Sequence, residues 1–162
     1  MLLAVLLLFG GCVGSSPNED SSLKQGSGFK TLGSVTWLLS YDEALKKAKA
    51  ENRDMIMYVG ASSWCIYCQK MDKEVFSDKV IAGLIQDKYV PVVIDIDKRS
   101  NLKILQKYNI PGHPAFFIVN GEEKVLRTRI GYTKRDSFEE FLRGRGPSKA
   151  SSSQVSKVFK VK

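Results

Sequence analysis

The stretch that decides the fold runs from Val59 to Phe76, VGASSWCIYCQKMDKEVF, and holds two of the three cysteines of the chain. Cys65 and Cys68 stand two residues apart, separated by Ile66 and Tyr67. A pair with this spacing has four interpretations: a redox centre, half of a metal site, a haem attachment point, or a structural disulfide. Most of what the protein does depends on which of them holds.

Three of the four interpretations are disfavoured. A closed structural zinc site needs four ligands, and the chain offers this pair, a single histidine and Cys12, without a second Cys-x-x-Cys motif. Covalent haem attachment requires a histidine directly after the second cysteine, where the chain has Gln69. A structural bridge across two residues closes a very small loop and stabilises little. Redox exchange is left as the favoured interpretation.

The local sequence also favours redox chemistry. The residues from Trp64 or Cys65 onward are predicted to begin a helix, so the Cys65 sulfur would lie at the positive end of the helix dipole. Both the dipole and the unpaired amides favour the thiolate, which is the nucleophile in disulfide exchange. Cys68, one turn further on, would resolve the mixed disulfide. Trp64 would cover the sulfurs, although a tryptophan in this position is also compatible with an ordinary core residue.

Strands and helices alternate around this motif. Continuous apolar runs predict strands, helical composition predicts the segments between them, and Asn120-Gly121 predicts a hairpin. Ser40 is expected to cap the first helix. The expected strands are 34–39, 54–60, 89–97, 115–119 and 124–130, and the expected helices are 41–52, one from about 65, 78–88, 100–109 and 133–144. This order predicts an α/β fold with a central mixed β-sheet and helices on both faces.

Two motifs in this order resemble the thioredoxin superfamily: SSWCIYCQKM after a buried strand, and later YNIPGHPAFFIVNGE. The chain looks most like exported bacterial thioredoxin-like proteins and the thioredoxin-like domain of the periplasmic electron-transfer protein DsbD. The resemblance implies a thioredoxin fold, a redox-active disulfide between Cys65 and Cys68, and no cofactor. It also implies that Pro114 is a cis-proline that faces the disulfide from the start of a strand.

The chain departs from the family pattern at a buried position. Cytosolic thioredoxins carry an acid six residues before the first cysteine as a proton relay for the second thiol, and that position is Val59 here. Asp72, Glu74 and Asp95 are the alternatives that we consider for this role, and the sequence does not choose among them.

Two further departures concern the surroundings of the cysteines. The residue before Pro114 is His113, which either tunes the thiolate or hydrogen-bonds to substrate, or is a partly exposed turn residue. Ile66 and Tyr67 supply no charge near Cys65, so the helix terminus must do most of the activation. We therefore expect a moderate thiolate pKa and not an extreme oxidant.

The two ends of the chain differ from its body. Residues 1–11 resemble a signal peptide. The stretch Phe9-Gly10-Gly11-Cys12 resembles a lipoprotein signal, in which Cys12 would be lipidated. The alternatives are a plain signal peptide and a short anchoring segment. Residues 12–33 are predicted to be a tether, 34–143 the thioredoxin-like domain and 144–162 a basic disordered tail. The net charge of +8 comes mostly from the last twenty residues or so, which is weak evidence for nucleic-acid binding.

We expect a thiol:disulfide oxidoreductase, acting as a reductase in the periplasm or cell envelope and anchored there as a lipoprotein. The expected partners are substrate proteins with disulfides, with apocytochrome c as one candidate, and a membrane electron donor of the DsbD type, but no nucleic acid and no bound metal. The alternatives are a disulfide donor or isomerase, a thioredoxin-fold carrier of peptides or Cu(I) with little turnover, and an adapter that acts through its basic tail.

Overall fold

The computed structural model describes residues 28–61 and 63–145, and within them six strands form one mixed sheet. The spatial order is β1-β2-β4-β3-β5-β6. The central strands β2, β4 and β3 run parallel, and each outer pair is antiparallel. The strands are β1 Phe29–Leu32, β2 Val35–Leu38, β3 Asp54–Gly60, β4 Tyr89–Asp95, β5 Ala115–Val119 and β6 Val125–Ile130.

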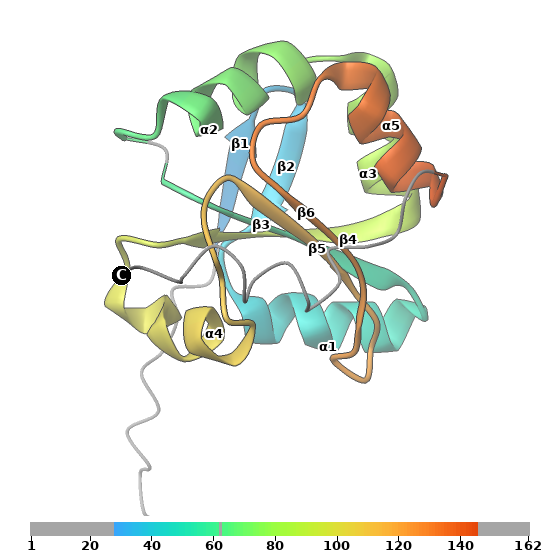
Figure 1. The fold of residues 1–162 in the computed structure, drawn as a ribbon. Coiled ribbons are helices and arrows are strands. Elements are labelled where there is room, and N and C mark those ends of the chain that lie inside the picture. The colour runs from blue at the N-terminus through green and yellow to red at the C-terminus, as the bar shows by residue number, and fades with distance from the viewer. Residues whose placement is uncertain (1–27, 62, 146–162) are drawn as a thin grey trace, which may run out of the picture.

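Helices cover both faces of this sheet, as predicted (Figure 1). One face carries α1 and α4, and the other carries α2, α3 and α5. The helices are α1 Tyr41–Glu51, α2 Ile66–Lys70, α3 Lys79–Lys88, α4 Leu102–Lys107 and α5 Arg135–Arg143, with a π-helical segment η1 Met71–Val75 directly after α2 and a 3₁₀ turn η2 Arg99–Asn101 before α4. The arrangement is the predicted α/β fold with a mixed sheet between two helical layers.

Short polar side chains cap the starts of α1 and α3. Ser40 accepts a hydrogen bond from the Glu43 amide at the start of α1, as predicted. Asp78 accepts from the amides of Val80 and Ile81 at the start of α3. These caps satisfy amides in the first turns of α1 and α3, which lie on opposite faces of the sheet.

Strand β3 lies at the centre of the sheet and is buried on both faces. Its side chains alternate between two cores, as successive residues of a strand must. Ile56 and Tyr58 point into the core beneath α2, α3 and α5, whereas Met57 and Val59 point into the core beneath α1 and α4. The chain leaves β3 at Gly60 and turns directly into the segment that holds the two cysteines.

The sheet begins earlier than predicted. Strand β1 lies in the segment 12–33 that we expected to be tether, so the folded domain starts at Phe29 and not at residue 34. Four residues give too short a pattern to predict a strand, and its pairing depends on Gly33, which turns the chain at φ 58°. A Cβ at Gly33 would lie 2.4 Å from the Phe76 carbonyl carbon, so only glycine allows this turn to pack there.

The other differences are small. The hairpin loop extends from Asn120 to Lys124, because the Asn120 side chain accepts hydrogen bonds from the amides of Glu122 and Lys124. The positive φ falls on Glu123 and not on Gly121. Among the described residues no helix is long and apolar enough to cross a membrane. The predictions for the signal peptide, Cys12 and most of the basic tail fall on residues 1–27 and 146–162, outside the described residues.

Candidate active site

Cys65 is the N-cap residue of α2, in the position that the sequence predicted for the start of the helix. Its backbone amide donates to the Ala61 carbonyl, at 3.3 Å, which ties the loop back to the end of β3. Its Sγ accepts a hydrogen bond from the Cys68 amide, at 3.1 Å. A sulfur that accepts from the first turn of a helix is stabilised as a thiolate when it is reduced.

Cys68 lies one turn along α2 and forms a disulfide with Cys65, with their Cα atoms 5.2 Å apart. The exposed fraction is 5% for Cys65 and 0% for Cys68. The first sulfur is therefore the one near the surface, and the second lies behind it in the core beneath α2, α3 and α5. This order is the one that attack by Cys65 and resolution by Cys68 require.

The segment before β5 completes the site from the other side. The His113–Pro114 peptide bond is cis, and Pro114 is buried. His113 is partly buried, and its Nδ1 lies 3.7 Å from the Cys65 Sγ. Although 48 positions separate these two residues, the pairing of β3 with β5 brings the end of one strand beside the start of the other.

Trp64 covers the site from outside and is not a core residue. Its exposed fraction is 55%, and its ring meets the His113 ring edge-on at a centroid distance of 5.0 Å. Its Nε1 donates to the Asp97 carboxylate at 2.9 Å. The indole is thus held over His113, which in turn lies against the Cys65 sulfur.

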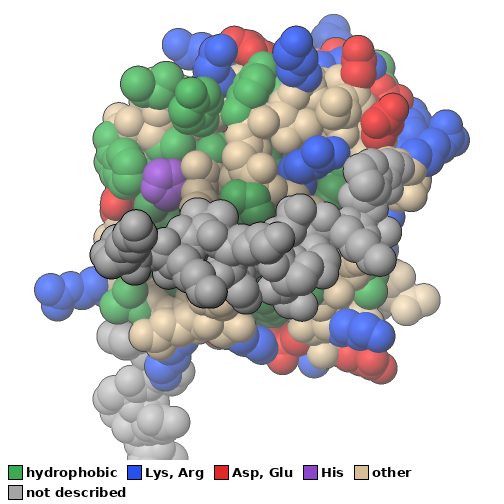
Figure 2. Space-filling model, in the orientation of Figure 1, with side chains coloured by type: hydrophobic (Ala, Val, Ile, Leu, Met, Phe, Trp, Pro, Cys, Tyr) green, Lys and Arg blue, Asp and Glu red, His purple; other side chains and the backbone are tan. Residues whose placement is uncertain are grey.

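Exposed apolar side chains flank the two cysteines. Ile66 and Tyr67 are 72% and 60% exposed, although both are large and hydrophobic. Figure 2 shows hydrophobic side chains gathered beside the single histidine, in purple. Exposed apolar surface next to a reactive group is typical of a site that binds a partner. The sequence singled out Ile66 and Tyr67 for their lack of charge, and the structure adds that they face outward.

The position expected for the buried acid does not face the cysteines. Val59 packs in the core beneath α1 and α4, while Tyr58 shares the core of Cys65 and Cys68. Counting back from the first cysteine missed Tyr58; the alternation of β3, whose residues point to opposite faces in turn, could have found it. The residue that lies behind the disulfide from β3 is therefore a tyrosine.

Asp72 is the charged residue with the most perturbed pKa on this side of the sheet. Burial raises the pKa of its carboxyl from 3.8 to about 6, while Lys30 acts in the opposite direction. Burial, and secondly the charge of Asp72, raise the pKa of Tyr58 as well. The two side chains therefore interact electrostatically behind the disulfide.

The donor atoms of Cys65, Cys68 and His113 lie within 4.8 Å of one another. Two thiolates and an imidazole suit a soft ion such as Cu(I), once the disulfide is reduced. This is the one group among residues 28–61 and 63–145 that brings three such ligands together.

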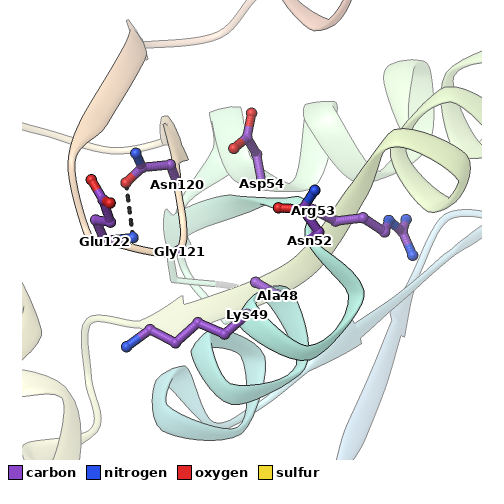
Figure 3. A pocket seen from close by; sticks show the side chains of 8 residues that line it. All are labelled: Ala48, Lys49, Asn52, Arg53, Asp54, Asn120, Gly121 and Glu122. Carbon is purple, nitrogen blue, oxygen red and sulfur yellow. Dashed lines mark hydrogen bonds between the residues drawn. The ribbon is translucent and has the colours of Figure 1, made fainter.

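A cavity of about 460 Å³ lies elsewhere (Figure 3). It is lined by the end of α1, the first residue of β3 and the loop after β5, whereas the cysteines follow the last residue of β3. Its lining is mostly polar, with Lys49, Asp54 and Glu122 among it, and it has no part in the chemistry of the disulfide.

Comparison with known proteins places the chain among thioredoxin-like domains. Residues 41–145 match the family model described as a thioredoxin-like domain. The thiol:disulfide interchange protein DsbD of Campylobacter jejuni is 32% identical over 118 residues, which cover 68% of this chain. The match covers 20% of that relative, so the chain spans about a fifth of its length.

Solved structures agree in fold. A thioredoxin from Thermus thermophilus superimposes with a TM-score of 0.59 at 28% identity, covering 65% of this chain and 83% of its own. The C-terminal domain of DsbD from Neisseria meningitidis superimposes with a TM-score of 0.54 at 19% identity, covering 65% and 93%. The latter likeness concerns the fold alone.

Proposed function

Because the chain belongs to the thioredoxin-like domain family of thiol:disulfide oxidoreductases, with a Cys65–Cys68 pair, we propose that it reduces substrate disulfides in the bacterial cell envelope. The observation that carries this proposal is the position of the Cys65 sulfur, which caps α2 by accepting a hydrogen bond from the Cys68 amide. The same sulfur lies beside His113 and its cis peptide bond to Pro114. An activated outer sulfur with a buried partner is what two-step exchange needs.

The reaction proceeds through a mixed disulfide. The Cys65 thiolate attacks one sulfur of the substrate disulfide, and the other sulfur leaves as a thiolate that takes up a proton. Cys68 then loses its proton and attacks Cys65, which releases the second substrate sulfur. Two electrons pass from the Cys65–Cys68 dithiol to the substrate. Pro114 positions the substrate backbone, and the exposed Trp64, Ile66 and Tyr67 contact its side chains.

Reduction is the proposed direction because nothing at the site favours an extreme oxidant. Ile66 and Tyr67 place no charge beside Cys65, and the side chain that lies against its sulfur is the His113 ring. The thiolate is then stabilised moderately, and the disulfide is correspondingly less oxidising.

The proposed reductase needs a source of electrons. A membrane donor of the DsbD type is the proposed source, because the relatives carry that name, and apocytochrome c is one candidate among the protein disulfides that receive the electrons. Anchoring through a lipid on Cys12, with residues 1–11 removed as a signal peptide, would hold the domain at the membrane.

Trapping the intermediate tests the function. Cys68→Ser leaves Cys65 without a resolving partner, so we expect a stable mixed disulfide between Cys65 and a disulfide-containing protein, seen by mass. Cys65→Ser is the matched control, because it keeps one thiol but removes the sulfur that lies nearer the surface. Failure of Cys68→Ser to form any adduct under conditions in which the Cys65–Cys68 pair is reduced would contradict the proposed exchange.

A second candidate function rests on the cluster of Cys65, Cys68 and His113. We propose, as the alternative, a carrier of Cu(I) in which the three residues bind the ion and turnover is low. Copper that stays bound at one ion per chain in an excess of glutathione, and that is lost with His113→Ala, would favour the carrier. Release of the copper to glutathione would favour the reductase.

A further inference from the structure

The position at which the family carries a buried proton acceptor is Val59 in this chain, and valine cannot accept a proton. Another group must therefore accept the proton of Cys68. Cys68 is 0% exposed, and its thiol must lose a proton before it can attack the mixed disulfide. The Val59 side chain lies in the opposite core from Cys68. An acid that serves this thiol must therefore reach it from the core beneath α2, α3 and α5.

Tyr58 reaches the inner sulfur from β3. Gly60 leaves an open space there, and a Cβ at this glycine would lie 2.9 Å from the Tyr58 hydroxyl oxygen and 3.1 Å from the Cys68 Sγ. Both atoms thus border the same small space. Tyr58 is 2% exposed, and its ring is stacked on Phe116 with a centroid distance of 5.2 Å, which fixes where the hydroxyl lies.

Asp72 reaches the same region from the helical segment that carries the cysteines. It follows Cys68 by four residues, which places both side chains near one face of that segment. Its Oδ1 is buried and has no hydrogen-bond partner within residues 28–61 and 63–145. The charge of Asp72 raises the pKa of Tyr58. No hydrogen bond joins this carboxylate oxygen to the Tyr58 hydroxyl, so a proton would need a water molecule to pass between them.

The two other acids considered from the sequence are engaged elsewhere. Glu74 accepts a hydrogen bond from the Tyr132 hydroxyl and pairs with Lys70, and its side chain is 46% exposed. Asp95, at the end of β4, accepts from the Asp97 amide at 3.0 Å and shapes the turn there. Asp72 is the acid of the three whose carboxylate oxygen is buried without a partner in the described part of the chain.

We propose that Asp72 receives the proton of Cys68 by way of the Tyr58 hydroxyl and a water molecule between that hydroxyl and Asp72, in place of the acid that is absent at Val59. The inference rests on the proposed exchange reaction and names the groups that complete its second step. Tyr58 and the reacting sulfur border the same small space beside Gly60, whereas Asp72 acts through Tyr58 and is a positioning and proton-holding residue. If electrons flow in the other direction, the same pair returns the proton to Cys68.

The Cys68 S–H bond breaks, its proton moves across the space beside Gly60 to the Tyr58 hydroxyl, and the proton of that hydroxyl passes through the water molecule to Asp72. The Cys68 thiolate forms a bond to the Cys65 sulfur as the bond between Cys65 and the substrate sulfur breaks. The electron pair leaves with the substrate sulfur, so the substrate is reduced and the cysteine pair is oxidised.

The charges around Asp72 suit this role. Tyr58 keeps its proton at neutral pH, because its pKa is raised, and so transfers protons without holding a charge. Asp72, with a pKa of about 6, is mostly ionised at neutral pH and is ready to accept. Lys30 on β1 counters the burial by lowering the pKa of Asp72, and Asp95 lies on the same face of the sheet at the end of β4.

The test follows the mixed disulfide through time. Reduced full-length protein is mixed with oxidised glutathione at pH values between 5 and 9. The reaction is quenched with acid at successive times, and the products are identified by mass spectrometry. For the wild type we expect brief accumulation of the glutathione adduct on Cys65 and a resolution rate that rises through pH 6. Asp72→Asn should form the adduct at the wild-type rate but resolve it about 100-fold more slowly, without the rise near pH 6.

Three further variants make the result specific. Tyr58→Phe should slow the same step, because it removes the hydroxyl between the two groups. Asp95→Asn and Glu74→Gln remove a charge nearby and should resolve the adduct as the wild type does. Wild-type rates and an unchanged pH profile in Asp72→Asn would overturn this inference while leaving the proposed function intact. A wild type that forms no adduct would overturn both.

Discussion

At the scale of single residues, burial of the Asp72 carboxyl lowers the stability of the folded protein at neutral pH. Its pKa is raised by burial, so the folded protein holds the ionised form less well than the unfolded chain does. Well below pH 3.8 the group is protonated in both states. As the pH rises through the interval between 3.8 and about 6, the unfolded chain ionises first, so the free energy of unfolding falls.

Asp72→Asn should therefore be more stable than the wild type above pH 6 and equally stable near pH 3. We expect a gain of about 1 kcal/mol at pH 8, after allowance for the solvent that screens a partly exposed side chain. Urea unfolding of the oxidised proteins at both pH values measures the gain. A variant that is less stable at pH 8 would show that Asp72 has a stabilising partner.

His113 is the second residue with a testable role. Its Nδ1 lies 3.7 Å from the Cys65 Sγ, so the imidazole is placed to stabilise the Cys65 thiolate once the disulfide is reduced. We expect His113→Ala to slow alkylation of Cys65 at pH 7 by roughly tenfold, the effect of losing about 1.5 kcal/mol of hydrogen bonding to a charge. The measurement is iodoacetamide labelling over a pH series.

His113→Gln is the control, because it keeps a hydrogen-bond donor but cannot become positively charged. Labelling of both variants at the wild-type rate would mean that the helix terminus activates Cys65 alone.

At the scale of elements, β1 joins the sheet to the segment that follows the cysteines. The Ser34 amide donates to the Phe76 carbonyl at 2.8 Å, directly after η1 ends, and Leu32 is 5% exposed. The turn at Gly33 thus packs against the end of the helical run that begins with Cys65. An edge strand far from the cysteines in sequence helps to hold the site in position.

A chain that begins at residue 34 should be less stable than one that begins at residue 28. Loss of the buried Leu32 alone corresponds to about 2 kcal/mol, and the pairing with β2 is lost as well. Chemical denaturation of the two chains tests this. Equal midpoints would mean that β1 adds nothing to the folded domain.

Elements with strong local patterns were predictable from the sequence. The run 54–60 predicted β3 with its observed bounds, and Ser40 marked the start of α1 correctly, because burial on both faces and helix capping leave distinct patterns. Strand β1 was not predictable, since four residues with one buried side chain give no periodicity. The same holds for the residues of the site. The spacing of Cys65 and Cys68 predicted their role, whereas the role of Tyr58 could be seen only once the face of β3 on which each residue lies was known.

At the scale of the whole molecule, the charge and the chemistry lie in different parts. Six basic residues and no acidic one follow Leu142: Arg143, Arg145, Lys149, Lys157, Lys160 and Lys162. The folded domain closes with Gly144, which ends α5 in a left-handed conformation, and with the Arg145 amide, which donates to the Glu140 carbonyl. The contacts at the disulfide described above are all made by residues within 28–61 and 63–145.

A chain that ends at Arg145 should therefore exchange disulfides at the rate of the full chain. The comparison uses reduction of insulin or oxidised glutathione by both chains under the same conditions. Loss of exchange in the shorter chain would favour the adapter that acts through its basic tail.

The central claim is that Cys65 and Cys68 form a redox couple that works as a reductase. Its reduction potential, measured by equilibrating the protein with glutathione or dithiothreitol buffers and counting alkylated thiols by mass, tests this most directly. The account predicts a value near that of thioredoxin, about −270 mV. A value near about −120 mV would contradict it and indicate a disulfide donor, and a pair that never equilibrates with either buffer would contradict exchange altogether.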